Sequence, residues 1–174
     1  LFEETTIAVQ PLVEKKNLIL SVSIQANLPE VYCDRTRIRQ VILNLVSNAA
    51  RFTETGGIHI QAFTNNGKVE VCVADTGPGI IPEDLEHIFE PFFQGSRNLW
   101  RGREGSGLGL SISQQFIKLH DGRLWVESEL GNGSQFHFEL PVNQGAAHLP
   151  SAGQWIRDDW VWREEAFKAG KIQF

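Results

Sequence analysis

The sequence predicts an α+β fold, a two-layer α/β sandwich in which a mixed, mostly antiparallel sheet packs on helices. The first observation is a helical stripe of apolar residues between Asp34 and Phe52. The second is a pair of β-rich runs on either side of Asn65-Asn66-Gly67, and the third is a closing pair around Gly131-Asn132-Gly133. Strands joined by such short turns are antiparallel neighbours.

Four segments are predicted to be helical. Residues 2–16 mix apolar and acidic residues in a short helical pattern, and Pro82 suits the first turn of another short helix. Asp34 suits the N-cap of the long helix, whose apolar stripe consists of Ile38, Val41, Ile42, Leu45, Val46 and Ala49. A last helix begins near residue 108, with an apolar face formed by Leu108, Ile112, Phe116 and Leu119.

Five segments are predicted to be strands because they are rich in β-branched residues or alternate in polarity. They are residues 18–24, 58–63, 69–73, 123–128 and 134–140. Between them, residues 94–107 show no periodicity. A loop of that length in a compact domain is usually functional or mobile.

The composition is that of a globular protein, with 41% hydrophobic and 21% charged residues among 174. Because the formal net charge is −5, the chain lacks the basic balance typical of nucleic-acid binding, and no nucleic-acid partner is expected. No apolar run reaches the ~18–20 residues of a membrane span. We expect this chain to lie in the cytoplasm. The parent protein can still be anchored by a membrane segment elsewhere in its sequence. Cys33 and Cys72 are predicted to be free thiols.

Residues 1–141 are predicted to form one domain. The remainder, 142–174, is predicted to be a polar linker over 142–153 followed by an amphipathic helix over 154–169, which holds three of the five Trp residues. The chain begins with Leu1 and contains no Met, so we expect it to be part of a longer protein.

A polar row accompanies the apolar stripe of the long helix. Asn44, Asn48 and Arg51 follow i, i+4, i+7 spacing and therefore share a second face. A solvated polar face is one interpretation. However, Asn is unfavourable inside helices, and an amide oxygen can coordinate Mg²⁺ while an Arg neutralises phosphate oxygens. The row is therefore also a candidate phosphate–magnesium site.

Two glycine-containing segments are candidates for close contact with a ligand. Asp75-Thr76-Gly77-Pro78-Gly79-Ile80 follows a β-rich run, and a buried Asp there can accept a hydrogen bond from an exocyclic amine such as that of adenine. Gly105-Ser106-Gly107-Leu108-Gly109-Leu110 precedes a helix, whose first N–H groups can bind phosphate. An ordinary turn is the alternative for the first segment. The second segment has the spacing of neither a dinucleotide fingerprint nor a P-loop, and a lone Gly-rich turn is weak evidence for a ligand.

Taken in order, five segments resemble the sequence boxes of sensor histidine kinases. They are 39–53 (N box), 75–80 (first glycine box), 89–93 (F box), 105–110 (second glycine box), and 131–136 with Leu140-Pro141 (closing signature). The resemblance covers about residues 1–141. It implies the ATP-binding sandwich of the GHKL superfamily, also called the Bergerat fold, with ATP and Mg²⁺ as ligands.

The resemblance implies a role for each matching residue. Asn48 resembles the Mg²⁺ ligand, with Asn44 one turn before it beside the phosphates, while Arg51 replaces the usual Lys and Phe52 would stack on adenine. Asp75 resembles the acceptor of the adenine amine. Glycines and their neighbours complete the nucleotide site: Gly77, Gly79 and Ile80 at the base; Gly105, Gly107, Leu108 and Gly109 at the phosphates; and Ser134. Residues 94–104 resemble the lid, with Arg97, Arg101 and Arg103 near the phosphates and Phe89, Phe92 and Phe93 as its anchor. Without the resemblance, these Phe residues are predicted to be core aromatics.

The resemblance also distinguishes phosphoryl transfer from hydrolysis. The ATPases of the superfamily place a Glu general base one turn before the magnesium Asn, where this chain has Asn44. An amide cannot take that proton, so transfer to an acceptor is expected instead. None of His59, His87, His120, His137 and His148 has the context of an acceptor histidine, and each is predicted to be structural or on the surface.

The implied function is the catalytic domain of a two-component sensor histidine kinase. It would transfer the ATP γ-phosphoryl group to a histidine on a separate dimerisation domain of the same protein. The resemblance also implies that the parent protein is a homodimer, with a response regulator downstream. Two alternatives remain at this point. One is a serine-kinase anti-sigma factor of the same superfamily, and the other is a regulatory nucleotide-binding module without transfer activity.

Overall fold

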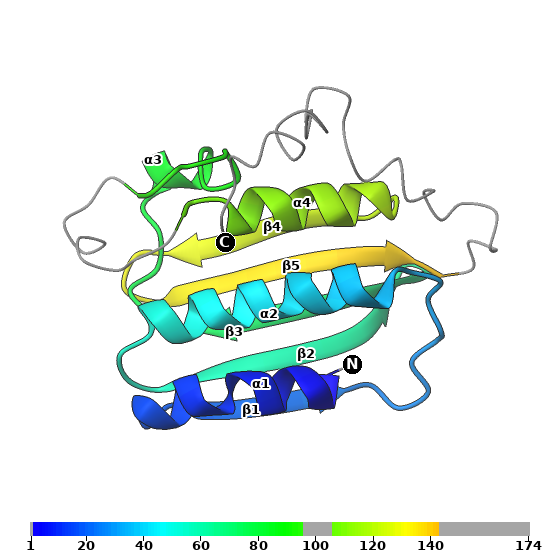
Figure 1. Ribbon diagram of the computed structural model, residues 1–174, viewed down its shortest axis with the longest axis horizontal. Coiled ribbons are helices and arrows are strands. Elements are labelled where there is room, and N and C mark those ends of the chain that lie inside the picture. The colour runs from blue at the N-terminus through cyan, green and yellow to red at the C-terminus, as the bar shows by residue number, and fades with distance from the viewer. Residues whose placement is uncertain (1, 96–105, 143–174) are drawn as a thin grey trace, which may run out of the picture.

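The computed structural model describes residues 2–95 and 106–142, and Figure 1 shows helices layered on one face of a sheet. The helices are α1 (Phe2–Lys15), α2 (Arg35–Phe52), α3 (Pro82–Leu85) and α4 (Gly109–Leu119). The strands are β1 (Ile19–Ile24), β2 (Gly57–Asn65), β3 (Lys68–Asp75), β4 (Arg123–Glu129) and β5 (Gly133–Pro141). This confirms the predicted two-layer α+β sandwich. The predicted linker from residue 143 on and the helix over 154–169 lie outside the described residues.

The sheet is mixed and mostly antiparallel, as predicted. Its strand order is β1-β2-β3-β5-β4, and only the β1–β2 pair is parallel among the described strands. The β2–β3 hairpin turns at Asn66 and Gly67, whose φ angles are 48° and 75°. Positive φ at both central residues matches the right-handed twist of the flanking strands. This turn aligns Ile58 with Asp75 across the hairpin.

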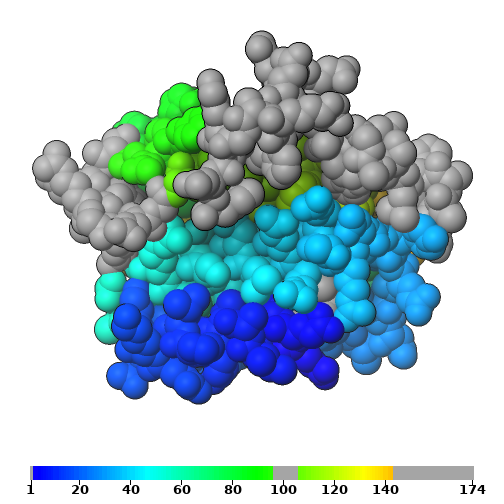
Figure 2. Space-filling model, viewed as in Figure 1, coloured from blue at the N-terminus to red at the C-terminus, as the bar shows by residue number. Residues whose placement is uncertain are grey.

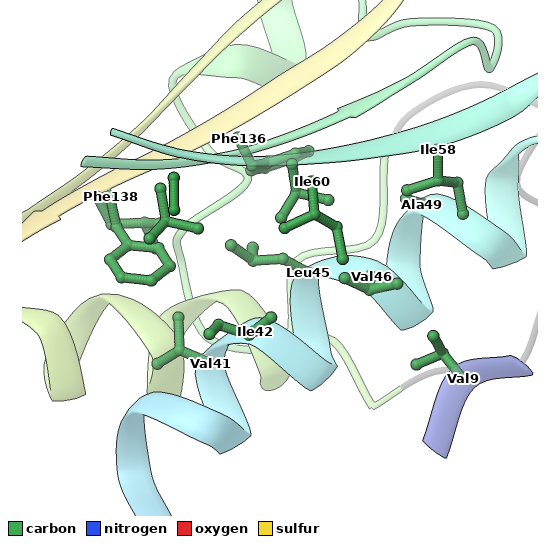
Figure 3. Packing of buried hydrophobic residues seen from close by; sticks show 14 of the residues in the cluster. Val9, Val41, Ile42, Leu45, Val46, Ala49, Ile58, Ile60, Phe136 and Phe138 are labelled. Atoms are coloured by element: carbon green, nitrogen blue, oxygen red, sulfur yellow. The ribbon is translucent and has the colours of Figure 1, made fainter. Parts of the chain in front are cut away.

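The core lies between α2 and the sheet (Figure 3). The apolar stripe of α2 meets alternate residues of β2 and β5 from the opposite side. The labelled side chains at this contact are Val41, Ile42, Leu45 and Val46 from α2, Ile58 and Ile60 from β2, and Phe136 and Phe138 from β5. Helix α1 adds Val9 and Val13 beside α2, and Figure 2 shows the two helices side by side on the helical face. The predicted stripe of α2 is therefore confirmed as the core face.

Helix α4 buries a different face from the predicted one. Its buried residues are Ser113 and Ile117, whereas Ile112, Phe116 and Leu119 are only half-buried. Leu108 precedes the helix and is also half-buried. The reason is a polar contact, because Asn44 of α2 donates from Nδ2 to Ser113 Oγ at 3.0 Å. Apolar periodicity could not show that a serine occupies the centre of this interface.

Side chains hold both ends of α2, that of the residue directly before it and that of a residue from another segment. At the start, Asp34 Oδ1 accepts the N–H groups of Thr36 and Arg37 at 2.9 and 3.1 Å, as an N-cap should. At the end, Lys16 Nζ donates to the carbonyl oxygens of Arg51 and Thr53 at 2.7 and 2.9 Å. A cation at a helix C-terminus also complements the helix dipole. These contacts fix the position of α2 along the sheet.

The turn after β3 packs directly against the β4–β5 connection. Gly131 donates its N–H to the carbonyl oxygen of Pro78 at 2.8 Å, and Ile80 donates its N–H to Ser128 Oγ at 2.9 Å. Gly79 has a φ of 69°, and a Cβ added there would overlap the backbone carbonyl of Glu129. Glycine is therefore required at residue 79 both by conformation and by the close approach of two backbones.

Removing a core side chain from α2 should destabilise the domain. We expect Leu45→Ala to lower the free energy of unfolding by about 2–5 kcal/mol, because Leu45 is fully buried and leaves a cavity. Leu12→Ala is the matched control, since Leu12 lies on α1 and is 47% exposed. It should cost less than about 1 kcal/mol. Urea unfolding followed by circular dichroism measures both, and equal losses would contradict this packing.

Two glycines with positive φ separate conformational strain from backbone overlap. Gly67→Ala should cost about 1–2 kcal/mol, because its φ is 75° but no atom lies within 4 Å of an added Cβ. Gly79→Ala should cost at least about 1 kcal/mol more, because its Cβ also meets the Glu129 carbonyl. The measurement is chemical denaturation of the two variants under identical conditions. A Gly79→Ala variant as stable as Gly67→Ala would show that this loop is not packed as described.

Candidate functional site

The polar row of α2 lies next to the first turn of α4. Asn44, Asn48 and Arg51 are all half-buried, beside the fully buried stripe. Asn44 connects the two helices, because its Nδ2 bonds Ser113 and its Oδ1 occupies the place where Gly109 would carry a Cβ. Only glycine at residue 109 allows this approach. The fold thus brings two of the predicted site residues, Asn44 and Gly109, into contact, although they are far apart in the sequence.

Asn48 lies one turn after Asn44 on the same row. Its side-chain amide makes no hydrogen bond to another described residue. The described residues also contain no group of three or more His, Cys, Asp or Glu side chains arranged to hold a metal ion. A cation at this site would therefore be held by the Asn48 amide oxygen together with oxygens of a bound ligand.

The end of α2 presents a cation and an aromatic ring. The Arg51 guanidinium carbon lies 5.9 Å from the centre of the Phe52 ring, and both side chains are half-buried. Lys16 binds the Arg51 carbonyl, so the backbone that carries these two side chains is fixed. Arg51 thus keeps a positive charge beside the polar row, where phosphate groups would need it.

Asp75 ends β3 in a half-buried position. Its Oδ1 accepts the N–H of Gly77 at 2.7 Å, and the backbone N–H of Ser134 on β5 also donates to the carboxyl group. Burial raises the pKa of the Asp75 carboxyl, while these two donors and the Thr53 hydroxyl oppose that shift. The N–H groups of Gly77 and Ser134 therefore hold the carboxyl group from two separate parts of the chain.

The segment from Gly77 to Ile80 forms a wall beside Asp75. Gly77, Gly79 and Ile80 are buried, and Ile80 packs on the hydrophobic core. Ser134 is buried too, but its hydroxyl faces Ser128 Oγ at 2.9 Å, and its backbone N–H is the group that reaches Asp75. The structure therefore places Ser134 as a support for Asp75 through its backbone.

The second glycine segment packs on the residues that follow α3. Gly107 has a φ of 69° and accepts the N–H of Phe92 at 2.9 Å through its carbonyl oxygen. Leu108 is half-buried and precedes α4. Phe89 packs against the core, but Phe92 is 72% exposed with a φ of 66°, so its prediction as a core aromatic is wrong. With its backbone bound to Gly107 in this conformation, Phe92 directs its ring toward solvent. Gly105, Arg97, Arg101 and Arg103 lie outside the described residues.

Helix α2 connects the two ends of the candidate site. Asn44 lies at the first turn of α4, and Thr53 lies at Asp75, nine residues further along. Nine residues of helix span about 13 Å. The site is therefore an elongated strip with amides and a helix N-terminus at one end and a half-buried carboxyl group at the other.

Sequence reasoning missed three residues that build this site. Lys16 holds the end of α2, Ser113 holds Asn44, and Thr53 lies beside Asp75. Lys16 and Ser113 belong to other elements, so their roles depend on contacts across the fold. Thr53 directly follows Phe52 and therefore had a positional signal, since it belongs to the same box.

The described histidines serve structural contacts, as predicted. His120 is buried, accepts the Asp34 N–H at Nε2 and donates from Nδ1 to the Phe116 carbonyl. His137 lies between the Glu70 carboxylate and the Trp125 ring. His59 contacts Ser21, and His87 contacts Glu90. His148 lies outside the described residues.

Residues 33–144 match the family described as histidine kinase-, DNA gyrase B-, and HSP90-like ATPases. The adaptive-response sensory kinase SasA of Thermosynechococcus vestitus is 45% identical over 144 residues, covering 82% of this chain and 37% of SasA. The chain therefore spans little more than a third of the length of that relative.

Solved structures show the same fold. Full-length ShkA in complex with AMPPNP matches with a TM-score of 0.71 and 35% identity, over 80% of this chain and 28% of that one. The catalytic domain of the histidine kinase ThkA matches with a TM-score of 0.69 and 37% identity, over 80% and 90% of the two chains. ThkA in complex with the response regulator TrrA matches with a TM-score of 0.67 and 35% identity, over 82% and 39%.

None of the helices in the described part of the chain is long and apolar enough to cross a membrane.

The family match covers the polar row of α2, the Asp75 turn and the residues around α4. The chain therefore belongs to the family of histidine kinase-, DNA gyrase B- and HSP90-like ATPases, and it is homologous to the catalytic domains of sensor histidine kinases.

Proposed function

We propose that this domain binds ATP with Mg²⁺ and transfers the γ-phosphoryl group to a histidine on a separate dimerisation domain of the same protein. The observation that carries the proposal is the strip along α2. It joins two half-buried amides, that of Asn44 at the start of α4 and that of Asn48 one turn further along α2, to a half-buried carboxyl group at Asp75. Such a strip suits a ligand with a polyphosphate at one end and an amine-bearing base at the other.

The base would bind at Asp75. An ionised carboxylate accepts hydrogen bonds, and the exocyclic amine of adenine donates them. Gly77 and Gly79 allow this turn to pack closely against Asp75 and the Glu129 backbone, and Ile80 supplies an apolar side chain beside the turn. Phe52 at the end of α2 would stack on the base. A guanine base presents a carbonyl in place of this amine, so Asp75 would disfavour it.

Mg²⁺ would be held by Asn48. The residues fit the ion, because the amide is half-buried and makes no hydrogen bond to another described residue. A neutral amide is suitable where phosphate oxygens supply the negative charge. When bound, Mg²⁺ would supply positive charge that neutralises the negative charge developing during transfer. Arg51 would complement that charge from the next turn of α2.

The phosphates would lie near the first turn of α4. The N–H groups at a helix N-terminus attract anions. Gly107 and Gly109 allow the Phe92 backbone and the Asn44 side chain to approach this turn closely. Leu108 separates the two glycines and belongs to the same segment. Asn44 supports the turn through Ser113 and Gly109.

Transfer is favoured over hydrolysis because of Asn44. Its amide cannot act as a general base, and its Nδ2 is already bonded to Ser113. The described histidines are each engaged in contacts within the domain. The acceptor would therefore be supplied by a dimerisation domain of a homodimeric parent. A response regulator would then receive the phosphoryl group. Because the reaction requires ATP, it would take place in the cytoplasm.

The role of Asn48 can be tested through the magnesium dependence of nucleotide binding. We expect Asn48→Ala to weaken binding of ATP in the presence of Mg²⁺ by at least about tenfold, a loss of ~1.4 kcal/mol. Binding of ADP in EDTA should change little. Isothermal titration calorimetry measures both, with Gln61→Ala on the exposed face of β2 as the control amide. Equal weakening with and without Mg²⁺ would argue against a metal ligand.

Phosphoryl transfer itself can be tested with γ-labelled ATP and the full-length protein that contains this chain. We expect a phosphorylated product that is labile to acid and stable to alkali, as phosphohistidine is. Asn48→Ala should lower the labelling rate by at least about tenfold, since charge neutralisation carries much of the barrier reduction. The chain of 174 residues alone should not label itself. Labelling on serine would contradict the proposal.

A further inference from the structure

We infer that Thr53 is a positioning residue for nucleotide recognition, whose buried hydroxyl orients the Asp75 carboxylate toward the exocyclic amine of the base. The inference rests on the proposed function, because it deepens the assignment of Asp75 to the adenine amine. Thr53 would act through Asp75 and would not itself contact the base.

The first observation is the state of the Thr53 hydroxyl. Thr53 directly follows α2 and is completely buried. Its backbone is satisfied, because its N–H donates to the Ala49 carbonyl and its own carbonyl accepts Lys16 Nζ. In contrast, Thr53 Oγ1 is the one buried side-chain nitrogen or oxygen within residues 2–95 and 106–142 that lacks a hydrogen-bond partner. Burying a hydroxyl in this way is unfavourable, so it calls for an explanation.

The second observation is the location of that hydroxyl. A Cβ added to Gly77 would lie 2.7 Å from Asp75 Oδ1 and 3.3 Å from Thr53 Oγ1. The two oxygens therefore lie on the same side of residue 77, and this close approach is possible because residue 77 has no side chain. The carbonyl oxygen of Phe52 lies 3.5 Å from the same point. Thr53 thus lies beside the carboxyl group to which the proposed function assigns the base.

The third observation is the chemistry of the pair. Toward an ionised carboxylate, a hydroxyl can act only as a donor. The Thr53 hydroxyl lies close enough to the Asp75 carboxyl to lower the pKa of that carboxyl. The geometry between the two groups does not yet meet that of a hydrogen bond. Burial raises the same pKa and favours the protonated form, which accepts an amine poorly. Thr53 therefore helps Asp75 remain an acceptor that faces the ligand.

The test compares two ligands that differ only at the amine. ADP carries the 6-amino group, and purine riboside 5′-diphosphate lacks it. Thr53→Val replaces the hydroxyl with a methyl group of similar size, and Thr53→Ser keeps the hydroxyl. We expect Thr53→Val to reduce the preference for ADP over the analogue by at least about tenfold, because a buried polar pair is what gives such discrimination. Thr53→Ser should keep the preference of the unaltered chain.

Dissociation constants from calorimetry give both affinities for each variant, and circular dichroism verifies folding. A role in folding alone would weaken both ligands by the same factor, and that result would overturn the inference. An unchanged preference in Thr53→Val would also overturn it. Thr53→Ala provides the same comparison if the Val variant does not fold.

The same experiment separates this inference from the proposed function. If the unaltered chain binds both ligands equally well, the assignment of Asp75 to the amine fails and the inference about Thr53 fails with it, while nucleotide binding stands. If the unaltered chain binds neither ligand, the proposed function fails as well. A preference that is lost only in the variants without the hydroxyl supports both.

Discussion

The packing of α2 on the sheet is the interaction on which the rest of this structure depends. Leu45 and Val46 face Ile60 and the central strands, and this contact excludes water from the largest apolar surface of the domain. Because a helix repeats every 3.6 residues, burying one stripe determines where every other residue of α2 points. The row with Asn44 and Asn48 therefore faces α4 and the site as a consequence of core packing.

The ends of α2 make that arrangement rigid. Lys16 binds the last carbonyls, and Asp34 caps the first N–H groups while its own N–H donates to His120. These contacts come from the segment after α1 and from the end of α4, so two other parts of the chain fix the position of α2. The candidate site extends along this helix. Because Lys16 directly follows α1, a displacement of α1 would also move the Lys16 ammonium group that binds the Thr53 carbonyl.

Much of the fold was predictable because its signals are local. The Asn66-Gly67 turn requires positive φ at two residues, and its chemistry predicts the β2–β3 hairpin without any knowledge of the sheet. The stripe of α2 is equally local. The face of α4 was predicted wrongly, because Ser113 is buried there by a hydrogen bond to Asn44, 69 residues away in sequence. Phe92 was misjudged for a related reason, since a turn onto Gly107 forces its ring into solvent.

By itself the sequence determined the elements, the order of the boxes and the candidate residues, because these follow from periodicity, turn chemistry and residue type. It indicated that Asn48 and Asp75 belong to one site only through resemblance. The tertiary structure decided which groups touch. It placed Asn44 against Gly109, directed the backbone of Ser134 toward Asp75, and left the Thr53 hydroxyl buried beside the same carboxyl group. Contacts of this kind depend on how separate elements pack, and packing is a property of the whole chain.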